Sequence, residues 1–497
     1  MNRVTHWIDG KSWSGTAERT GQVFDPATGQ VTAAVDFAEQ SEVEAAVSAA
    51  SEAFPAWRGT SLAKRTAILF NFRELLASSV VELAAIVSAE HGKVPSDAAG
   101  EVSRGLEVVE FACGIAHLLK GEISEDVSSS VDAYSLRQPL GVVAGITPFN
   151  FPAMVPMWMF PLAIACGNTF VLKPSEKDPS ASIFLASRLA EAGLPEGVFN
   201  VLHGDKVAVD GLLSHPQVAA VSFVGSTPIA RYVYATAASH GKRVQALGGA
   251  KNHMVVMPDA DLDAAADAAV SAAYGSSGER CMAISTVVAV AGAGDALVDR
   301  IRDRARRVRV GRASEPDSEM GPLITAAHRD KVTSYLDAGV NAGATLVLDG
   351  REHPIEGDPS GYWLGPTLFD RVTPDMSVYT DEIFGPVLSV LRVDTLEEAL
   401  ELIAASPFGN GAAIFTTDGA AARQFQHEAE AGMVGINVPV PVPVSQFSFG
   451  GWGNSLFGDL HVYGPDGVRF YTRAKAVTSR WTNTAKAGAN LVFPTYD

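Results

Sequence analysis

The sequence predicts an α/β fold in which one chain forms two α/β domains. From residue 142 onward, short runs of β-branched residues alternate with helical segments, and the runs lack the polar alternation of a half-exposed strand. Strands of this kind form parallel sheets that helices cover on both faces. A second series of the same type follows Cys281, and 497 residues suffice for two or three domains.

The first series contains strands that we predict at 142–146, 169–172, 198–201, 221–224 and 254–257. Helices are predicted among them at 179–192 and 228–238. Pro179 and Gly193 stand at the start and the end of the first of these helices, as is typical of helix boundaries. Upstream, apolar residues recur at helical spacing over 64–87 and predict a helical segment with one buried face.

The second series is predicted to contain strands at 286–290, 345–348, 387–390, 412–415 and 434–437, and helices at 294–308, 396–405 and 419–431. Valine and proline then alternate over 438–443. Proline cannot donate to a strand ladder, so this segment is predicted to be an extended connector outside the central sheet.

A stretch without any charged residue runs from Arg137 to Lys173 and could be mistaken for a membrane span. Four prolines and two asparagines interrupt it, at positions 148, 150, 152, 156, 161 and 168. Helix-breaking residues at this density favour a buried strand, an active-site loop and a core helix instead.

Charge and cysteine content narrow the class of protein. The formal net charge of −18 disfavours binding to nucleic acid or to anionic membranes and mainly favours solubility. Three cysteines in a chain of this length indicate a reducing compartment, and their spacing excludes a CxxC metal or redox site, so no metal is expected. The first residues lack the apolar core of a signal peptide, and we predict a cytoplasmic protein.

The segment 274–281 carries the candidate nucleophile, Cys281. It lies between a helix predicted to end near residue 275 and a strand predicted to start near 286, and two glycines let its backbone bend tightly. The neighbouring Arg280 is expected to favour the thiolate. The alternative is that a free cysteine is simply a small apolar residue, and this is the interpretation adopted for Cys113 and Cys166.

Five further motifs surround this cysteine in sequence. They are TPFNFP at 147–152, LKPSE at 172–176, FVGS at 223–226, LGG at 247–249 and EIFGP at 382–386. Each is weak alone, but together with the Gly-x-x-Cys segment, and in this order, they resemble the aldehyde dehydrogenase superfamily over nearly the whole chain. The resemblance implies an aldehyde dehydrogenase-like fold with a Rossmann-type NAD domain, a second α/β catalytic domain and a small oligomerisation arm.

The resemblance also implies a division of the chain and an assembly. Residues 1–122 and 142–247 would form the NAD-binding domain, and 248–460 the catalytic domain. Residues 123–141 and 461–497 would form the arm and tail that join subunits into a homodimer or homotetramer.

In the family, the cysteine that matches Cys281 attacks the aldehyde carbonyl. The amide that matches Asn150, together with the backbone N–H of the cysteine, holds the resulting oxyanion. Acyl chemistry needs such fixed donors, and losing one costs roughly 10²–10³ in rate. The alternative for Asn150 is a turn residue between two prolines.

NAD binding rests on the resemblance, because the chain contains no GxGxxG fingerprint. The residues expected at the cofactor are Thr147, Phe149, Lys173, Glu176, Lys177, Ser226, Gly248 and Glu382. The FVGS turn would hold phosphate at a helix N-terminus, although the family commonly has glycine where this chain has Ala230. A carboxylate at the adenine ribose repels a 2′-phosphate, so Glu176 beside Lys173 favours NAD over NADP. Glu382 matches the ligand of the nicotinamide ribose. The alternative for Lys173 and Glu176 is an exposed turn, and the alternative for Glu382 is a carboxylate at the start of a helix.

The residue before the LGG motif is Ala246, where hydrolytic members of the family have a glutamate that activates water. Alanine cannot accept a proton, so a thioester on Cys281 would persist until a better nucleophile arrived. The thiol of coenzyme A is such a nucleophile, and CoA is therefore expected as co-substrate.

The segments 249–253, 278–283 and 448–459 are similar to those of one CoA-acylating branch of the family. The similarity implies oxidation and decarboxylation of methylmalonate semialdehyde to propionyl-CoA and of malonate semialdehyde to acetyl-CoA. In that branch the residues that match Arg104 and Arg280 bind the substrate carboxylate, a task that suits planar guanidinium groups. The alternative for Arg104 is a solvated helix face amid Glu101 and Glu107. Two other functions stay open: a hydrolytic NAD-dependent aldehyde dehydrogenase, and an inactive NAD-binding structural protein.

Overall fold

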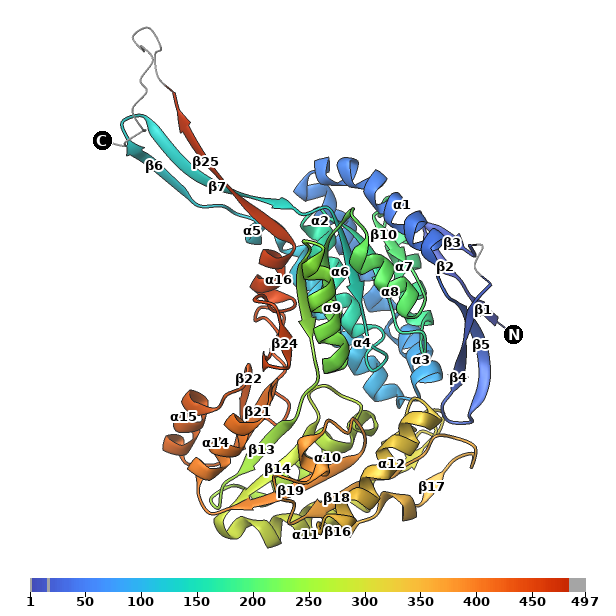
Figure 1. Cartoon of the computed structure of the whole chain (residues 1–497), viewed down its shortest axis with the longest axis vertical. Helices are drawn as coiled ribbons and strands as arrows, with labels where there is room; N and C mark the ends of the chain where they lie inside the picture. Colours follow the sequence, from blue (N-terminus) through green and yellow to red (C-terminus); the bar gives the residue numbers. More distant parts are fainter. Residues whose placement is uncertain (1, 16–17, 482–497) are drawn as a thin grey trace.

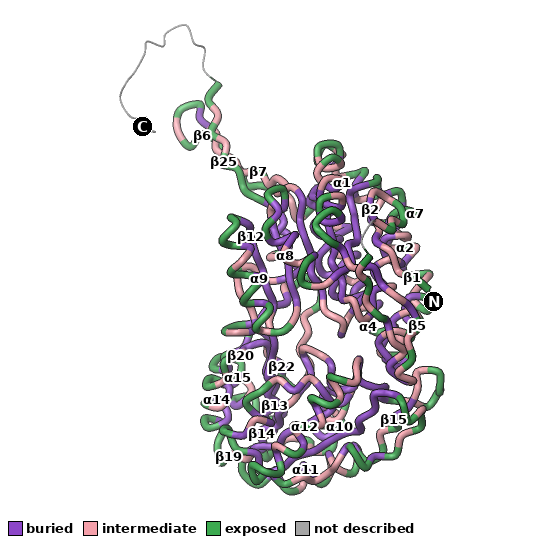
Figure 2. The backbone as a smooth tube through the Cα atoms, turned by 45° about the vertical axis from the view of Figure 1, so that its right-hand side comes forward, coloured by how far each residue is buried: buried purple, intermediate pink, exposed green. Residues whose placement is uncertain are grey.

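The computed structural model describes residues 2–15 and 18–481. Two largely parallel sheets, each with its own helices, form the two lobes of the molecule, and a narrow β-arm projects from one lobe (Figure 1). The backbone is buried through the centres of both lobes, whereas the arm is mostly exposed (Figure 2). The α/β fold predicted from the sequence is confirmed.

Within the described residues, the strands of the first sheet follow the order β24-β12-β11-β8-β9-β10-β2-β3. Its parallel centre consists of β8 (Val142–Ile146), β9 (Thr169–Lys173), β10 (Phe199–Val201), β11 (Val218–Val224) and β12 (Arg243–Leu247). Its antiparallel edges are β2 (His6–Ile8), β3 (Lys11–Trp13) and β24 (Leu456–Phe457). The strands predicted at 142–146, 169–172, 198–201 and 221–224 are confirmed in this sheet, whereas the strand predicted at 254–257 belongs to the second sheet as β13. Among the central strands, β12 was not predicted.

The helices around this sheet are α1 (Gln40–Gly59), α2 (Leu62–Ser78), α3 (Val80–His91), α4 (Pro95–Cys113), α6 (Met154–Ala165), α7 (Ser180–Glu191), α8 (Lys206–Ser214) and α9 (Thr227–Ser239). The helical segment predicted at 64–87 is two helices that meet at Ser79, whose ψ of 14° leaves the helical range. At this break Ser78 Oγ donates to the carbonyl of Leu75 at 2.9 Å, so a serine side chain competes for a backbone acceptor of the helix.

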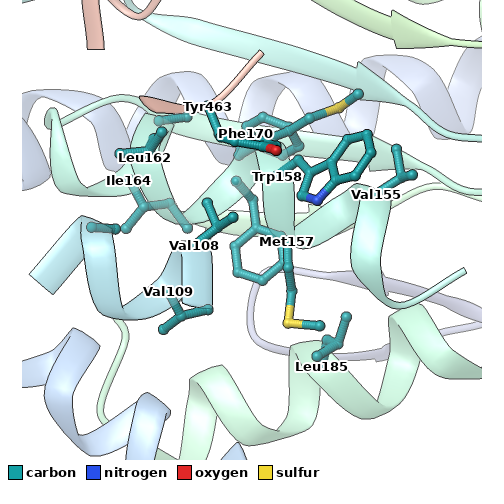
Figure 3. Packing of buried hydrophobic residues seen from close by; sticks show 14 of the residues in the cluster. Val108, Val109, Val155, Met157, Trp158, Leu162, Ile164, Phe170, Leu185 and Tyr463 are labelled. Carbon is teal, nitrogen blue, oxygen red and sulfur yellow. The ribbon is translucent and has the colours of Figure 1, made fainter. Parts of the chain in front are cut away.

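The charge-free stretch contains β8, a loop, α6 and β9, as predicted. All residues of α6 are buried, and Met157, Trp158 and Leu162 pack against α4, α7 and β9 in the largest core cluster (Figure 3). In residues 2–15 and 18–481 no helix combines the length and apolarity that crossing a membrane requires.

The described strands of the second sheet follow the order β16-β18-β19-β14-β13-β21-β22. They are β13 (Asn252–Val256), β14 (Ile284–Val290), β16 (Thr345–Leu348), β18 (Thr367–Asp370), β19 (Val387–Val393), β21 (Gly411–Phe415) and β22 (Met433–Ile436). The accompanying helices are α10 (Leu262–Tyr274), α11 (Gly294–Ala305), α12 (Ala326–Asn341), α14 (Leu396–Ala405) and α15 (Gly419–Glu428). Residues 438–443 contain no strand, as predicted for the connector.

The arm is an antiparallel sheet of β6 (Ile123–Ser128), β7 (Val131–Pro139) and β25 (Thr472–Arg480). A further small sheet joins β1 (Asn2–Val4), β4 (Thr20–Asp25) and β5 (Gln30–Asp36). The domain division stays a prediction; the first sheet contains β12 and the second begins with β13, but β24, predicted with the catalytic domain, pairs with β12. The predicted tail at 482–497 lies outside the described residues.

Candidate active site

The loop that carries Cys281 joins α10 to β14 and contains a tight turn. Ser276 and Ser277 have positive φ values of 53° and 55°, which costs a non-glycine residue of order 1 kcal/mol. At Gly278, also at positive φ, a side chain is impossible because a Cβ atom would lie 2.2 Å from the carbonyl oxygen of Gly385. Of the two glycines expected to allow the bend, Gly278 therefore does so, whereas Gly275 has an ordinary φ of −54°.

Hydrogen bonds from other elements hold this turn. The backbone N–H of Ser276 donates to Asp97 Oδ2 at 2.9 Å, and Ser277 Oγ donates to the carbonyl of Gly321 at 2.7 Å. The carbonyl of Cys281 itself accepts from Asn252 Nδ2 at 2.9 Å and from Asn410 Nδ2 at 3.1 Å. These anchors were not predicted, because they come from four distant parts of the sequence.

The thiol of Cys281 is half-buried. Burial and, to a lesser extent, the nearby charge of Glu382 raise its pKa to about 12, whereas backbone N–H groups and Lys93 act in the opposite direction. The expectation that Arg280 favours the thiolate is wrong. The guanidinium of Arg280 is paired with Asp97, with 2.6 Å between Nη2 and Oδ1, so its charge is largely compensated.

On one side of Cys281 lies a cavity of about 200 Å³, which we call the cofactor-side cavity. Its lining includes the following residues predicted from the sequence: Phe149, Asn150, Ser226, Gly248, Cys281 and Glu382. They come from loops that follow β8, β11 and β12 and from loops that precede β14 and β19. The predicted nucleophile, oxyanion donor and nicotinamide-side ligand therefore share one cavity.

The other predicted cofactor residues are near this cavity but do not line it. The N–H of Thr147 donates to the carbonyl of Lys173 at 3.1 Å across the ends of β8 and β9. Lys173 is buried, and its Nζ lies 3.4 Å from Glu176 Oε2, so the alternative of an exposed turn does not fit Lys173, whereas the side chain of Glu176 is 39% exposed. The ammonium of Lys177 lies 4.5 Å from the ring centre of Phe149.

Glu382 is held against the LGG turn. Its Oε1 accepts from the N–H of Ala250 at 2.9 Å, and a Cβ atom on Gly249 would lie only 2.2 Å from Oε2. Gly249 thus makes room for the carboxylate. Burial raises the pKa of Glu382.

On its other side, Cys281 lines a cavity of about 460 Å³, the substrate-side cavity, together with Arg104 and Arg280. Arg104 on α4 donates to Glu107 at 2.7 Å and to the carbonyl of Pro443 at 3.0 Å. The alternative of a solvated helix face does not fit, because Glu101 is only 3% exposed and Arg104 faces the cavity. Met154, Trp158 and Phe449 supply apolar wall.

A buried ion pair that the sequence did not reveal positions the Asn150 loop. Lys93 and Glu101 are buried with 2.6 Å between Nζ and Oε2, and Lys93 also donates to the carbonyl of Asn150 at 2.5 Å. The second oxygen of Glu101 accepts from the N–H groups of Ala153 and Met154 at the start of α6. No periodicity or motif distinguishes such a pair in sequence.

Ala246 lies on β12 and is fully buried. It belongs to an apolar cluster with Phe223 and Ala230, on the opposite face of the strand from Leu247. It is not among the described residues that line either cavity. The position therefore presents no proton acceptor to Cys281.

Comparison with known proteins identifies the class to which this fold and site belong. The sequence profile of the aldehyde dehydrogenase family matches residues 13–477. The chain belongs to the aldehyde dehydrogenase family.

Particular relatives narrow the similarity. The chain is 56% identical to a malonate-semialdehyde dehydrogenase of Pseudomonas aeruginosa, covering 99% of this chain and 100% of the relative. It also resembles the crystal structure of a methylmalonate-semialdehyde dehydrogenase from Oceanimonas doudoroffii, with a TM-score of 0.96, 54% identity and coverage of 97% and 99%. A protein from Sinorhizobium meliloti 1021, assigned as a methylmalonate-semialdehyde dehydrogenase and solved in complex with NAD, gives a TM-score of 0.96 at 52% identity, with coverage of 98% and 99%.

Proposed function

We propose that the protein oxidises malonate or methylmalonate semialdehyde with NAD and passes the acyl group to coenzyme A, with loss of carbon dioxide. The observation that carries this proposal is the position of Cys281 between two cavities. One contains the residues expected at the nicotinamide, and the other contains two guanidinium groups. The names of the relatives support the same substrates.

The residues of the chain divide the chemistry among them. Cys281 loses its thiol proton to solvent and attacks the aldehyde carbon through Sγ, and the side-chain amide of Asn150 and the N–H of Cys281 hold the oxyanion. NAD, when bound, supplies the hydride acceptor. The resulting thioester on Cys281 is also an electron sink, because its carbonyl accepts the electron pair released when the β-carboxylate leaves as carbon dioxide. The same donors stabilise the enolate oxygen, and the enolate carbon then takes a proton from solvent to give the acyl group that is transferred.

Arg104 and Arg280 bind the substrate carboxylate before it leaves. Both side chains line the substrate-side cavity, and both are fixed by other groups, so little conformational entropy is lost when a carboxylate binds. Asp97 and Glu107 reduce the net charge of the site. We expect this reduction to let the product depart after the carboxylate is lost.

NAD binding, assembly and location complete the proposal. The cofactor residues named above would hold NAD, as the complex of the Sinorhizobium relative suggests. The exposed arm of β6, β7 and β25 would join subunits as a homodimer or homotetramer. A cytoplasmic location rests on the low cysteine content.

The decisive experiment is NADH formation from malonate semialdehyde with and without CoA. Without CoA we expect a burst of about one NADH per active site, followed by slow turnover that thioester hydrolysis limits. CoA should accelerate the steady state, leave the burst unchanged and yield acetyl-CoA. Equal turnover with and without CoA would establish a hydrolytic aldehyde dehydrogenase, and absence of any NADH formation, even of a single turnover, would establish an inactive NAD-binding protein.

A further inference from the structure

Transfer of the acyl group to CoA needs a group that accepts the thiol proton, and Ala246 cannot supply one. Three carboxylates among the described residues line cavities that Cys281 also lines: Asp97, Glu101 and Glu382. Asp97 has both oxygens engaged, by Arg280 and by the N–H of Ser276. Glu101 has both oxygens engaged as well, by Lys93 and by two backbone N–H groups.

Glu382 differs from the other two. Its hydrogen bond to the N–H of Ala250 uses Oε1, and Oε2 lies over Gly249, whose missing side chain leaves it space. Glu382 also lines the cofactor-side cavity together with Cys281 and with Gly248 and Gly249 of the LGG turn. In the sequence, that turn directly follows Ala246, the position that holds the base in hydrolytic relatives.

We propose that Glu382 is the general base that accepts the thiol proton of CoA during acyl transfer from Cys281. This inference rests on the proposed function. The CoA sulfur forms a bond to the thioester carbon as its proton passes to Glu382 Oε2, and Asn150 with the N–H of Cys281 holds the tetrahedral oxyanion. The bond between that carbon and Cys281 Sγ then breaks, and the Cys281 thiolate takes the proton back from Glu382.

Glu382 can serve a thiol although it serves water poorly. A thiol has a pKa of roughly 8.5, whereas water has a pKa of about 15.7, so a far weaker base suffices to deprotonate a thiol. Burial raises the pKa of Glu382 toward that of the thiol, which improves proton transfer. The same carboxylate can still bind the nicotinamide ribose, because the thioester exists only after the hydride has been transferred.

The charged and titratable groups around Glu382 must be considered in any pH measurement. They are Lys251 before β13, His328 and Lys331 on α12, and Cys281. The two lysines lower the pKa of Glu382 and partly offset the effect of its burial. Burial lowers the pKa of His328, so this side chain is neutral over the range in which the thiol of CoA ionises.

The test isolates acyl transfer from cofactor binding. Cys281 is acetylated with p-nitrophenyl acetate, which needs no NAD, and CoA is then added while intact-protein mass and acetyl-CoA are followed from pH 6 to 9. Glu382→Gln should slow transfer by about 10²–10⁴-fold below the pKa of the CoA thiol. Its rate should then rise about tenfold per pH unit, as expected when only free thiolate reacts, and Glu382→Asp should recover part of the loss.

Asp381→Asn is the matched control, because it removes the adjacent, exposed carboxylate and should transfer at the wild-type rate. Transfer by Glu382→Gln at the wild-type rate with the wild-type pH profile would show that Glu382 is not the base, and the proposed function would stand. A wild-type acetyl-enzyme that hydrolyses but never acetylates CoA would overturn the proposed function instead.

Discussion

The two cavities beside Cys281 are built in different ways. The cofactor-side cavity is formed by loops at the carboxyl ends of β8, β11 and β12, which meet loops of the second sheet. The substrate-side cavity is formed by side chains of α4 and α6 and by the connector near residue 440. Topology therefore positions the first, since parallel sheets bind ligands at these strand ends, whereas individual side chains define the second.

The difference between the two cavities indicates where substitutions can change substrate specificity. Substitutions on the exposed turns of a helix such as α4 alter the substrate side without moving any strand. The cofactor side contains backbone turns in which even a methyl group does not fit, as at Gly249 and Gly278. We therefore expect variants of the two sides to affect different kinetic parameters.

The largest effect is expected for Cys281→Ala, which removes the nucleophile shared by both cavities. NADH formation should be abolished, because no thiohemiacetal can form. The dissociation constant for NAD, measured by fluorescence titration, should stay within about twofold of the wild type, since the loops of the cofactor side remain intact. Appreciable turnover by this variant would contradict the assignment of the nucleophile.

A smaller, selective effect is expected for Arg104→Leu. Loss of a charge-assisted hydrogen bond of about 1.5–3 kcal/mol should raise the KM for malonate semialdehyde by roughly 10- to 150-fold. The KM for propanal, which lacks the carboxylate, should change little. Arg280→Leu should show the same preference but also lower kcat, because it leaves Asp97 without its partner in the nucleophile loop. Equal effects on both aldehydes would show that the arginines are structural.

The buried pair below the Asn150 loop should matter for stability. Lys93→Met leaves Glu101 buried without its cation, a change that costs roughly 3–5 kcal/mol. The matched control is Lys206→Met, which removes an exposed ion pair with Asp210, a kind of contact that contributes little to stability. The midpoint of thermal unfolding should fall clearly for the first variant and barely for the second. Comparable shifts would show that the buried pair contributes no more than an exposed one.

The contrast between a cavity built by topology and one built by individual side chains also explains which features the sequence could predict. Strands with continuous β-branched runs were found, but β12, which contains Arg243 and Gln245, and β18, which ends in Asp370, were not. Periodicity did not detect the break at Ser79, because the apolar spacing continues across it. Motifs located the residues of the cofactor side, since turns between strands need particular residues. The partners of the arginines and the Lys93–Glu101 pair depend on packing between distant helices, and no local pattern encodes that packing.

The smallest effect concerns the titration of Cys281, which the cofactor side controls. Because its pKa is raised to about 12, the thiol is protonated at neutral pH, and alkylation by iodoacetamide should quicken about tenfold per pH unit between 7 and 10. Glu382→Gln removes a charge that raises this pKa and should speed alkylation severalfold at each pH. Arg280→Leu should leave the rate nearly unchanged, since Asp97 already compensates its charge. Peptide mass mapping measures these rates, with the buried Cys113 and Cys166 as internal controls. A plateau below pH 8 would instead mean that Cys281 is a thiolate at rest, as the sequence alone had suggested.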